Sequence, residues 1–139
     1  MDRSLTPEGS KPVYGFVKEL DLRVPMRDGV RLAIDVYCPD GEGPFPALLA
    51  MGPYGKEGQV TGIPPGMFSA DYAHIEVGDT EYFCSRGYVH VVADVRGTGH
   101  SEGKYDICST KEQEDGYDLV EWIARQPWCD GNVGMVGVS

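Results

Sequence analysis

The last seven residues of the chain are Val133-Gly134-Met135-Val136-Gly137-Val138-Ser139. The first four are small or apolar, which predicts a short strand that packs tightly against its neighbours. The next three form the first half of a G-x-S-x-G motif, in which a strand enters a strained turn and a serine hydroxyl projects from its tip. A second glycine and a helix would complete the motif. Ser139 is therefore the candidate nucleophile.

Upstream of this segment, the first expected element is an antiparallel hairpin. Apolar and charged residues alternate over residues 17–24, with a change of phase near Glu19, as in a half-buried strand. Residues 26–29 supply a turn because an Asp-Gly pair readily adopts positive φ. The returning strand over residues 30–37 places four apolar side chains on one face: Val30, Leu32, Ile34 and Val36.

Later segments alternate between strands and helices. Residues 47–51 and 88–93 are almost entirely apolar, as in strands that are covered on both faces. A short helix is expected over residues 79–86, with Gly87 just past its end. Residues Thr110 to Gln113 fit a capping box that opens a longer helix. A hairpin followed by strand, helix, strand, helix and strand predicts an α/β fold with parallel members in a layered sheet.

Catalytic residues are expected at the carboxyl ends of these strands. Three segments lie there, namely residues 52–55, residues 94–103 and Ser139. A serine nucleophile needs a base and preplaced hydrogen-bond donors for the oxyanion that forms. Tyr54 follows the third strand, where one such donor is usually found, and its phenol can donate one hydrogen bond.

A Gly- and Pro-rich stretch over residues 55–70 is too irregular for core structure and long enough to be a functional loop. Its candidate pocket-lining residues are Pro64, Met67 and Phe68. Lys56, near its start, is expected to be a surface ammonium rather than a substrate clamp.

Five blocks of the chain follow one another in order: residues 24–32, 53–56, 87–89, 94–103 and 128–135. Together they resemble the cocaine esterase and X-Pro dipeptidyl-peptidase (CocE/NonD) family of serine hydrolases. The resemblance spans nearly the whole chain after about residue 15. It implies an α/β-hydrolase fold, with Ser139 as nucleophile and the Tyr54 hydroxyl as one oxyanion donor.

The same resemblance implies parts beyond this sequence: a triad Asp and His, a helical cap and a C-terminal jelly-roll-like domain. Residues 1–14 would then be an N-terminal extension, and residues 15–139 the N-terminal portion of the catalytic domain. The remainder of the same gene product is expected to complete the sheet. The implied activity is hydrolysis of an acyl ester, an α-amino-acid ester or an X-Pro peptide through an acyl-enzyme, with no cofactor and no metal. The alternative is a non-catalytic binding or interaction module that is complete at Ser139.

The loop after the fourth strand carries three glycines, Gly97, Gly99 and Gly103. Their spacing is one residue too long for a dinucleotide-binding motif, and no helix is expected directly behind them, so a nucleotide-binding domain is disfavoured. Asp94, Arg96 and Ser101 are expected to be structural, as a charged pair and a hydroxyl that satisfy a tight loop.

None of the histidines is expected to be the catalytic base, because the base follows the serine along the chain in this fold. His90 is expected to be packed within a strand, and His100 to be solvated in a loop. A small acidic and imidazole cluster lacks the spacing of a metal site: Asp71, His74, Glu76 and Asp79.

The amino-acid composition limits the kinds of molecule that the protein is expected to bind. The 139 residues carry a formal net charge of −10, which disfavours nucleic acid and anionic membranes. Four widely spaced cysteines are expected to be buried free thiols in a reduced compartment: Cys38, Cys84, Cys108 and Cys129. The sequence shows no leader and no run of transmembrane length, so a cytoplasmic location is expected, with a homo-oligomer left open.

Overall fold

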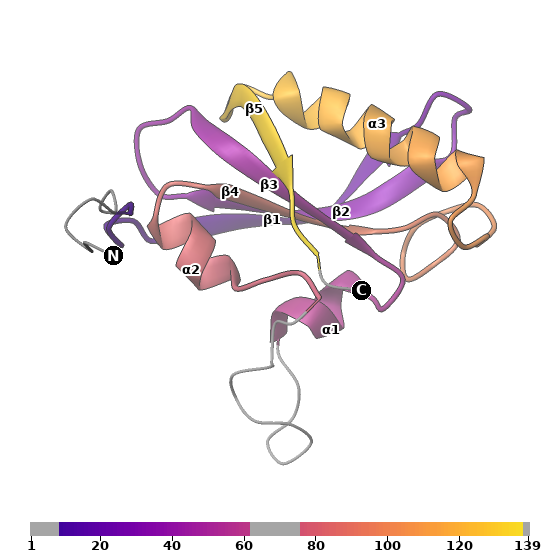
Figure 1. The fold of residues 1–139 in the computed structure, drawn as a ribbon, viewed down its shortest axis with the longest axis horizontal. Coiled ribbons are helices and arrows are strands. Elements are labelled where there is room, and N and C mark those ends of the chain that lie inside the picture. The colour runs from indigo at the N-terminus through magenta and orange to yellow at the C-terminus, as the bar shows by residue number, and fades with distance from the viewer. Residues whose placement is uncertain (1–8, 62–75, 138–139) are drawn as a thin grey trace, which may run out of the picture.

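The computed structural model describes residues 9–61 and 76–137. Within these residues five strands form one mixed sheet in the order β1-β2-β4-β3-β5 (Figure 1). The strands are β1 (Phe16–Pro25), β2 (Arg31–Pro39), β3 (Phe45–Gly52), β4 (Val89–Asp94) and β5 (Cys129–Met135). β1 and β2 pair antiparallel, as do β2 and β4, whereas β3 runs parallel to both β4 and β5. The expected α/β fold, with a hairpin followed by parallel strands, is confirmed.

The hairpin of β1 and β2 turns where the sequence predicts. Gly29 has a φ of 85°, and the Met26 N–H donates to the Val30 carbonyl over 2.8 Å to close the turn. The register of β1 shifts between Glu19 and Leu22, which confirms the change of phase expected there. Asp21 lies within this bulge and has a φ of 57°.

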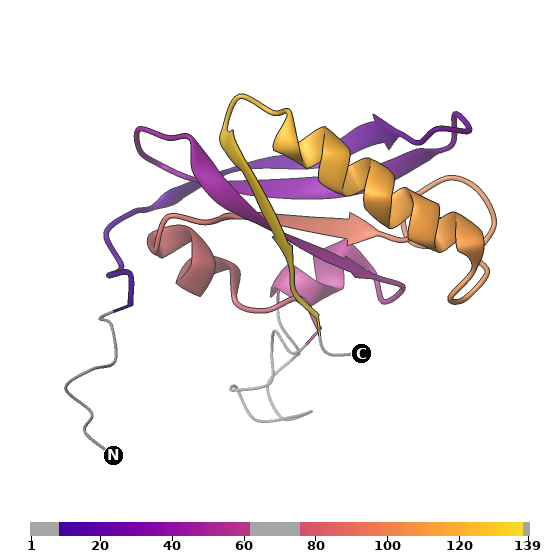
Figure 2. The ribbon, with the colours of Figure 1, turned by 45° about the horizontal axis from the view of Figure 1, so that its top comes forward.

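Helices cover both faces of the sheet. The helix α3 (Thr110–Ala124) lies on one face, and α1 (Lys56–Thr61) and α2 (Thr80–Ser85) lie on the other, as Figure 2 shows. α2 agrees with its prediction, with Asp79 as N-cap and Gly87 at a φ of 85° just past its end. The prediction that residues 55–70 are irregular is wrong at their start, where α1 forms. Pro64, Met67 and Phe68 lie outside the described residues.

The cap of α3 lies one residue earlier than predicted. The N-cap is Ser109, whose Oγ accepts from the Glu112 N–H over 3.2 Å, while Glu112 accepts from the Cys108 N–H over 2.7 Å. Ser109 and Glu112 have the same three-residue spacing as the predicted Thr110 and Gln113. Spacing alone therefore fits both registers, and the carboxylate of Glu112 makes the better partner.

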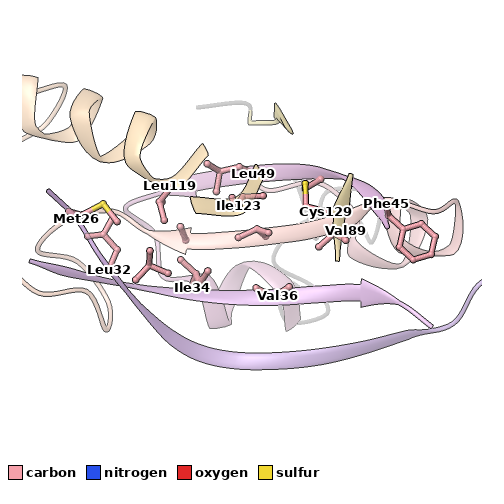
Figure 3. Packing of buried hydrophobic residues seen from close by; sticks show 14 residues of the cluster. Met26, Leu32, Ile34, Val36, Phe45, Leu49, Val89, Leu119, Ile123 and Cys129 are labelled. Carbon is pink, nitrogen blue, oxygen red and sulfur yellow. The ribbon is translucent and has the colours of Figure 1, made fainter. Parts of the chain in front are cut away.

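The sheet carries a core on each face. On one face, Leu119 and Ile123 of α3 pack against buried apolar side chains of β2, β3 and β4 (Figure 3). A smaller cluster lies on the opposite face: Tyr37, Ala50, Val77, Cys84 and Val92. Three cysteines are buried or half-buried free thiols as expected, but Cys108 is exposed, because it lies in the loop before α3 rather than in a strand.

Candidate active site

The ends of β3 and β4 lie side by side. Gly52, the last residue of β3, pairs with Asp94, the last residue of β4. The turn that follows β3 carries Tyr54, and the loop that follows β4 runs from Val95 to Ser109. Two of the three segments predicted to converge are therefore adjacent at one edge of the sheet.

Tyr54 lies on the exposed side of its turn. The residue is 55% exposed. Gly55 follows with a φ of 85°, a conformation that a side chain would strain. Desolvation is the main cause that raises the pKa of the Tyr105 phenol, followed by the charges of Glu112, Cys108 and Tyr54.

A small cavity of about 10 Å³ adjoins Tyr54, with room for about one water molecule. Lys56, Glu76 and Val77 are among its other lining residues. Glu76 Oε2 is buried and has no hydrogen-bond partner among the described residues. A side chain at Gly137 would meet the Glu76 carbonyl oxygen at 3.7 Å. The chain two residues before Ser139 thus passes beside the lining of the Tyr54 cavity.

The end of β5 is held against β3. The Val136 N–H donates to the Leu49 carbonyl over 3.0 Å, one residue past the end of β5. Ser139 itself lies outside the described residues, so its role as nucleophile stays a prediction.

The carboxylate of Asp94 organises the edge of the sheet. Its Oδ1 accepts from the Lys56 N–H over 2.7 Å, and its Oδ2 accepts from the His100 N–H over 2.9 Å. Gly99 allows this arrangement, because a Cβ there would lie 2.2 Å from Asp94 Oδ2. The Ser101 hydroxyl donates to the Asp94 carbonyl over 2.7 Å and accepts from the Ala33 N–H over 2.8 Å. The structural role expected for Asp94 and Ser101 is confirmed.

Arg96 does not pair with Asp94 in the described contacts, so that part of the expected charged pair is wrong. Its guanidinium instead makes a bidentate contact with the buried Asp115, at 2.7 and 2.8 Å, and contacts Asp28 at 2.9 Å. These hydrogen bonds raise the pKa of Arg96, Asp115 having the larger effect. Planar guanidinium geometry suits such bidentate pairing, which fixes the loop to α3 and to the hairpin turn.

Lys56 is not a surface ammonium, contrary to the prediction. Its side chain is 2% exposed, and its Nζ lies 2.8 Å from Asp35 Oδ1 and 3.4 Å from Asp21 Oδ1. Burial alone would lower the pKa of Lys56, but the hydrogen bonds and charges of the two carboxylates outweigh burial and raise it. The sequence held one signal for this pair, since Asp35 interrupts an apolar strand and a buried carboxylate needs a partner.

The described histidines have structural partners. His90 is fully buried, with Nδ1 2.9 Å from Thr80 Oγ1 and Nε2 2.9 Å from the Val77 carbonyl, as expected of a packed side chain. His100 is 46% exposed, in agreement with a loop position, and its Nδ1 lies 2.9 Å from Asp21 Oδ1. His74 lies outside the described residues.

The described residues contain no group of three or more His, Cys, Asp and Glu side chains that could hold a metal ion. Of the predicted cluster, Asp71 and His74 lie outside those residues, and Asp79 accepts from the Tyr82 N–H over 3.0 Å as the N-cap of α2. No described helix has the length and apolar character needed to cross a membrane.

A larger cavity of about 610 Å³ lies on the α3 side of the sheet. Its lining is mainly apolar and includes Met51, Val120 and Met135. Met51 also lines the small cavity beside Tyr54, whereas Tyr54 itself does not line the larger one.

Comparison with known proteins places the chain in a family. The family profile described as X-Pro dipeptidyl-peptidase (S15 family) matches residues 28–139. The chain belongs to this S15 family. Cocaine esterase of Rhodococcus sp. (strain MB1 Bresler) is 41% identical to it over 119 residues, which cover 86% of this chain and 19% of that protein.

Solved structures extend the S15 likeness to the fold. The crystal structure of a CocE/NonD family hydrolase from Staphylococcus aureus matches 88% of this chain with a TM-score of 0.75 and 31% identity. An α-amino acid ester hydrolase matches 99% of the chain with a TM-score of 0.67 and 26% identity. The S15 chain spans 23% and 24% of those two structures, about the same share as of its curated relative. Its sheet is thus the N-terminal part of an α/β-hydrolase fold.

Proposed function

We propose that this chain is the part of a serine ester hydrolase that supplies the nucleophile and one oxyanion donor. Ser139 attacks the ester carbonyl, and its proton passes to a histidine that follows it in the gene product and is oriented by an acid. The alcohol leaves with that proton, and water then hydrolyses the acyl-enzyme by the same route. The chemistry needs no cofactor.

In this proposal Tyr54 stabilises the negative charge that develops on the carbonyl oxygen of the substrate. Its hydroxyl donates to the oxyanion, and the backbone N–H after Ser139 donates the second hydrogen bond. The proposal is supported above all by the position of Tyr54, which follows β3 and adjoins a cavity lined by Glu76, whose carbonyl oxygen would lie 3.7 Å from a Cβ added at Gly137.

An ester is favoured over an X-Pro amide as substrate. Two of the similar proteins bear the names cocaine esterase and α-amino acid ester hydrolase, whereas the family description names a dipeptidyl-peptidase. An ester also has the better leaving group, so it places a smaller demand on the acid that protonates the departing atom.

The test uses the full gene product that contains this chain. We expect hydrolysis of p-nitrophenyl acetate and butyrate, much slower release of p-nitroaniline from an X-Pro p-nitroanilide, and loss of both activities on Ser139→Ala. A Ser101→Ala variant is the matched control for loss of a hydroxyl, because the Ser101 hydroxyl bonds to backbone groups. Full esterase activity in Ser139→Ala would contradict the proposal.

A further inference from the structure

Lys56 and Asp35 form an ion pair inside the fold. The Lys56 side chain is 2% exposed and that of Asp35 is 3% exposed, and their charged atoms lie 2.8 Å apart. Desolvating two charges is costly, and a buried pair often stabilises a fold no more than apolar residues of the same size would. Global stability is therefore a weak explanation for this pair, and its connections offer a better one.

The ion pair joins three segments that are distant in sequence. Asp35 lies in β2, Lys56 begins α1, and Asp21 lies in the bulge of β1. Asp35 Oδ1 also accepts from the Asp21 N–H over 2.8 Å, and the Asp21 carboxylate lies 3.4 Å from the Lys56 ammonium. The ammonium thus contacts carboxylates from two paired strands rather than from a loop.

Lys56 is held at its backbone as well as at its side chain. Its N–H donates to Asp94 Oδ1 over 2.7 Å, at the end of the neighbouring strand β4. On the other side of the turn, the Gly52 carbonyl accepts from the Val95 N–H over 3.3 Å. Tyr54 lies between these two attachments, with its side chain more exposed than buried. These two hydrogen bonds therefore hold both ends of the turn that carries Tyr54.

We propose that Lys56 and Asp35 are positioning residues, whose ion pair holds the Tyr54 hydroxyl where the oxyanion forms. This inference rests on the proposed function. Oxyanion donors act through placement, and a misplacement of about 1 Å can cost on the order of 100-fold in rate. Loss of the Lys56 ammonium should loosen one end of the turn that carries Tyr54. The Tyr54 hydroxyl would then still be present but displaced from the position of the oxyanion.

A double-mutant cycle in the full gene product tests the inference. Tyr54→Phe should lower kcat for p-nitrophenyl butyrate roughly 100- to 1000-fold. Lys56→Met should lower kcat about 10-fold with KM within about 2-fold, because positioning acts on the transition state. The variant with both changes should be no slower than Tyr54→Phe alone, since no hydroxyl remains to be positioned.

Lys111→Met is the matched control. This lysine is 56% exposed and its ammonium lies 3.6 Å from Asp28, so its removal should leave kcat and KM unchanged. If the losses from Lys56→Met and Tyr54→Phe multiply in the double variant, Lys56 acts independently of Tyr54 and the inference is wrong. If Tyr54→Phe leaves kcat unchanged, the oxyanion role in the proposed function fails instead.

Lys56→Met leaves Asp35 without its partner and can reduce folding. The variant Lys56→Met/Asp35→Asn removes both charges and should restore the melting temperature while kcat stays low. Recovery of both properties together would overturn the inference. Should this variant not fold, Lys56→Arg serves in the same cycle, since it keeps the charge but changes the geometry. If the kcat losses from Lys56→Arg and Tyr54→Phe multiply when the two changes are combined, the positioning role of Lys56 is again contradicted.

Discussion

The carboxylate of Asp94 accepts a hydrogen bond of 2.7 Å from the backbone N–H of Lys56. This contact joins the end of β4 to the first residue of α1, across the turn that carries Tyr54. A carboxylate that accepts backbone N–H groups from two segments fixes both, because each bond is directional and charge-assisted. The carboxylate of Asp94 therefore links both segments beside the proposed oxyanion donor.

Asp94→Asn should destabilise the protein and lower kcat. An amide has one acceptor oxygen, so one of the two backbone N–H groups, of Lys56 or of His100, loses its acceptor. The lost charge-assisted bond corresponds to roughly 1.5–3 kcal/mol of unfolding free energy. Urea unfolding and ester hydrolysis of the full gene product measure the two effects. Unchanged stability and rate would show that the edge of the sheet is held by other contacts.

Gly99→Ala should be more damaging than a glycine change at another left-handed position. Gly99 has a φ of 48°, and an added Cβ would lie 2.2 Å from Asp94 Oδ2. Strain of about 1–2 kcal/mol adds to the displacement of Asp94 from its hydrogen bonds, for a total of roughly 2–4 kcal/mol. Gly29→Ala is the control, since its φ is 85° but no atom lies within 4 Å of the new Cβ. Equal melting temperatures for the two variants would argue against a role for the close approach.

Stability should fall between pH about 4 and about 2 in part because of Asp28. The hydrogen bond from Arg96, opposed by a smaller effect of desolvation, lowers the pKa of Asp28 from 3.8 to about 2. The folded carboxylate therefore resists protonation, so its contribution is present above the unfolded pKa and is lost as pH falls toward the folded one. Urea midpoints of Asp28→Asn should differ from those of the wild type at pH 6 and converge with them near pH 2.

Asp40→Asn, on an exposed loop, is the control for this acid dependence. Its midpoint should follow that of the wild type at both pH values. A constant difference between Asp28→Asn and the wild type across the range would contradict the coupling to Arg96.

Thiol reactivity should separate Cys108 from Cys84. Burial raises the pKa of Cys84 to about 12, and its Sγ lies 3.4 Å from the Tyr37 carbonyl, whereas Cys108 is exposed. Because the thiolate is the reactive form, iodoacetamide at pH 8 should alkylate Cys108 at least about 100-fold faster than Cys84. Peptide mass spectrometry of the native protein measures the ratio, which should approach unity in urea. Comparable rates in the native protein would mean that Cys84 is not enclosed.

Local patterns in the sequence predicted most of the strands and two of the helices. The alternation of Leu32, Ile34 and Val36 identified the core face of β2, because a period of two leaves little choice of face. Asp79 and Gly87 likewise marked the ends of α2, since caps depend on neighbouring residues alone.

Long-range contacts account for what the sequence did not predict. In the sequence, Lys56 follows a turn and looks like a surface residue. Its burial depends on Asp35, which contacts it only when β2 and α1 come together in the fold. The partner of Arg96 was missed for the same reason, since Asp115 lies in α3. The strand-end positions did predict that the segments after β3 and β4 are neighbours, because Gly52 and Asp94 end two parallel strands that pair with each other.

The site of covalent labelling by a fluorophosphonate tests the central claim most directly. The reagent phosphonylates an activated serine hydroxyl and reports the nucleophile irrespective of substrate preference. Treatment of the full gene product, followed by peptide mass spectrometry, should place one adduct on Ser139 and none on Ser101 or Ser109, with labelling lost in Ser139→Ala. An adduct on another serine, or no adduct on a folded and otherwise active enzyme, would contradict the assignment of Ser139 as the nucleophile.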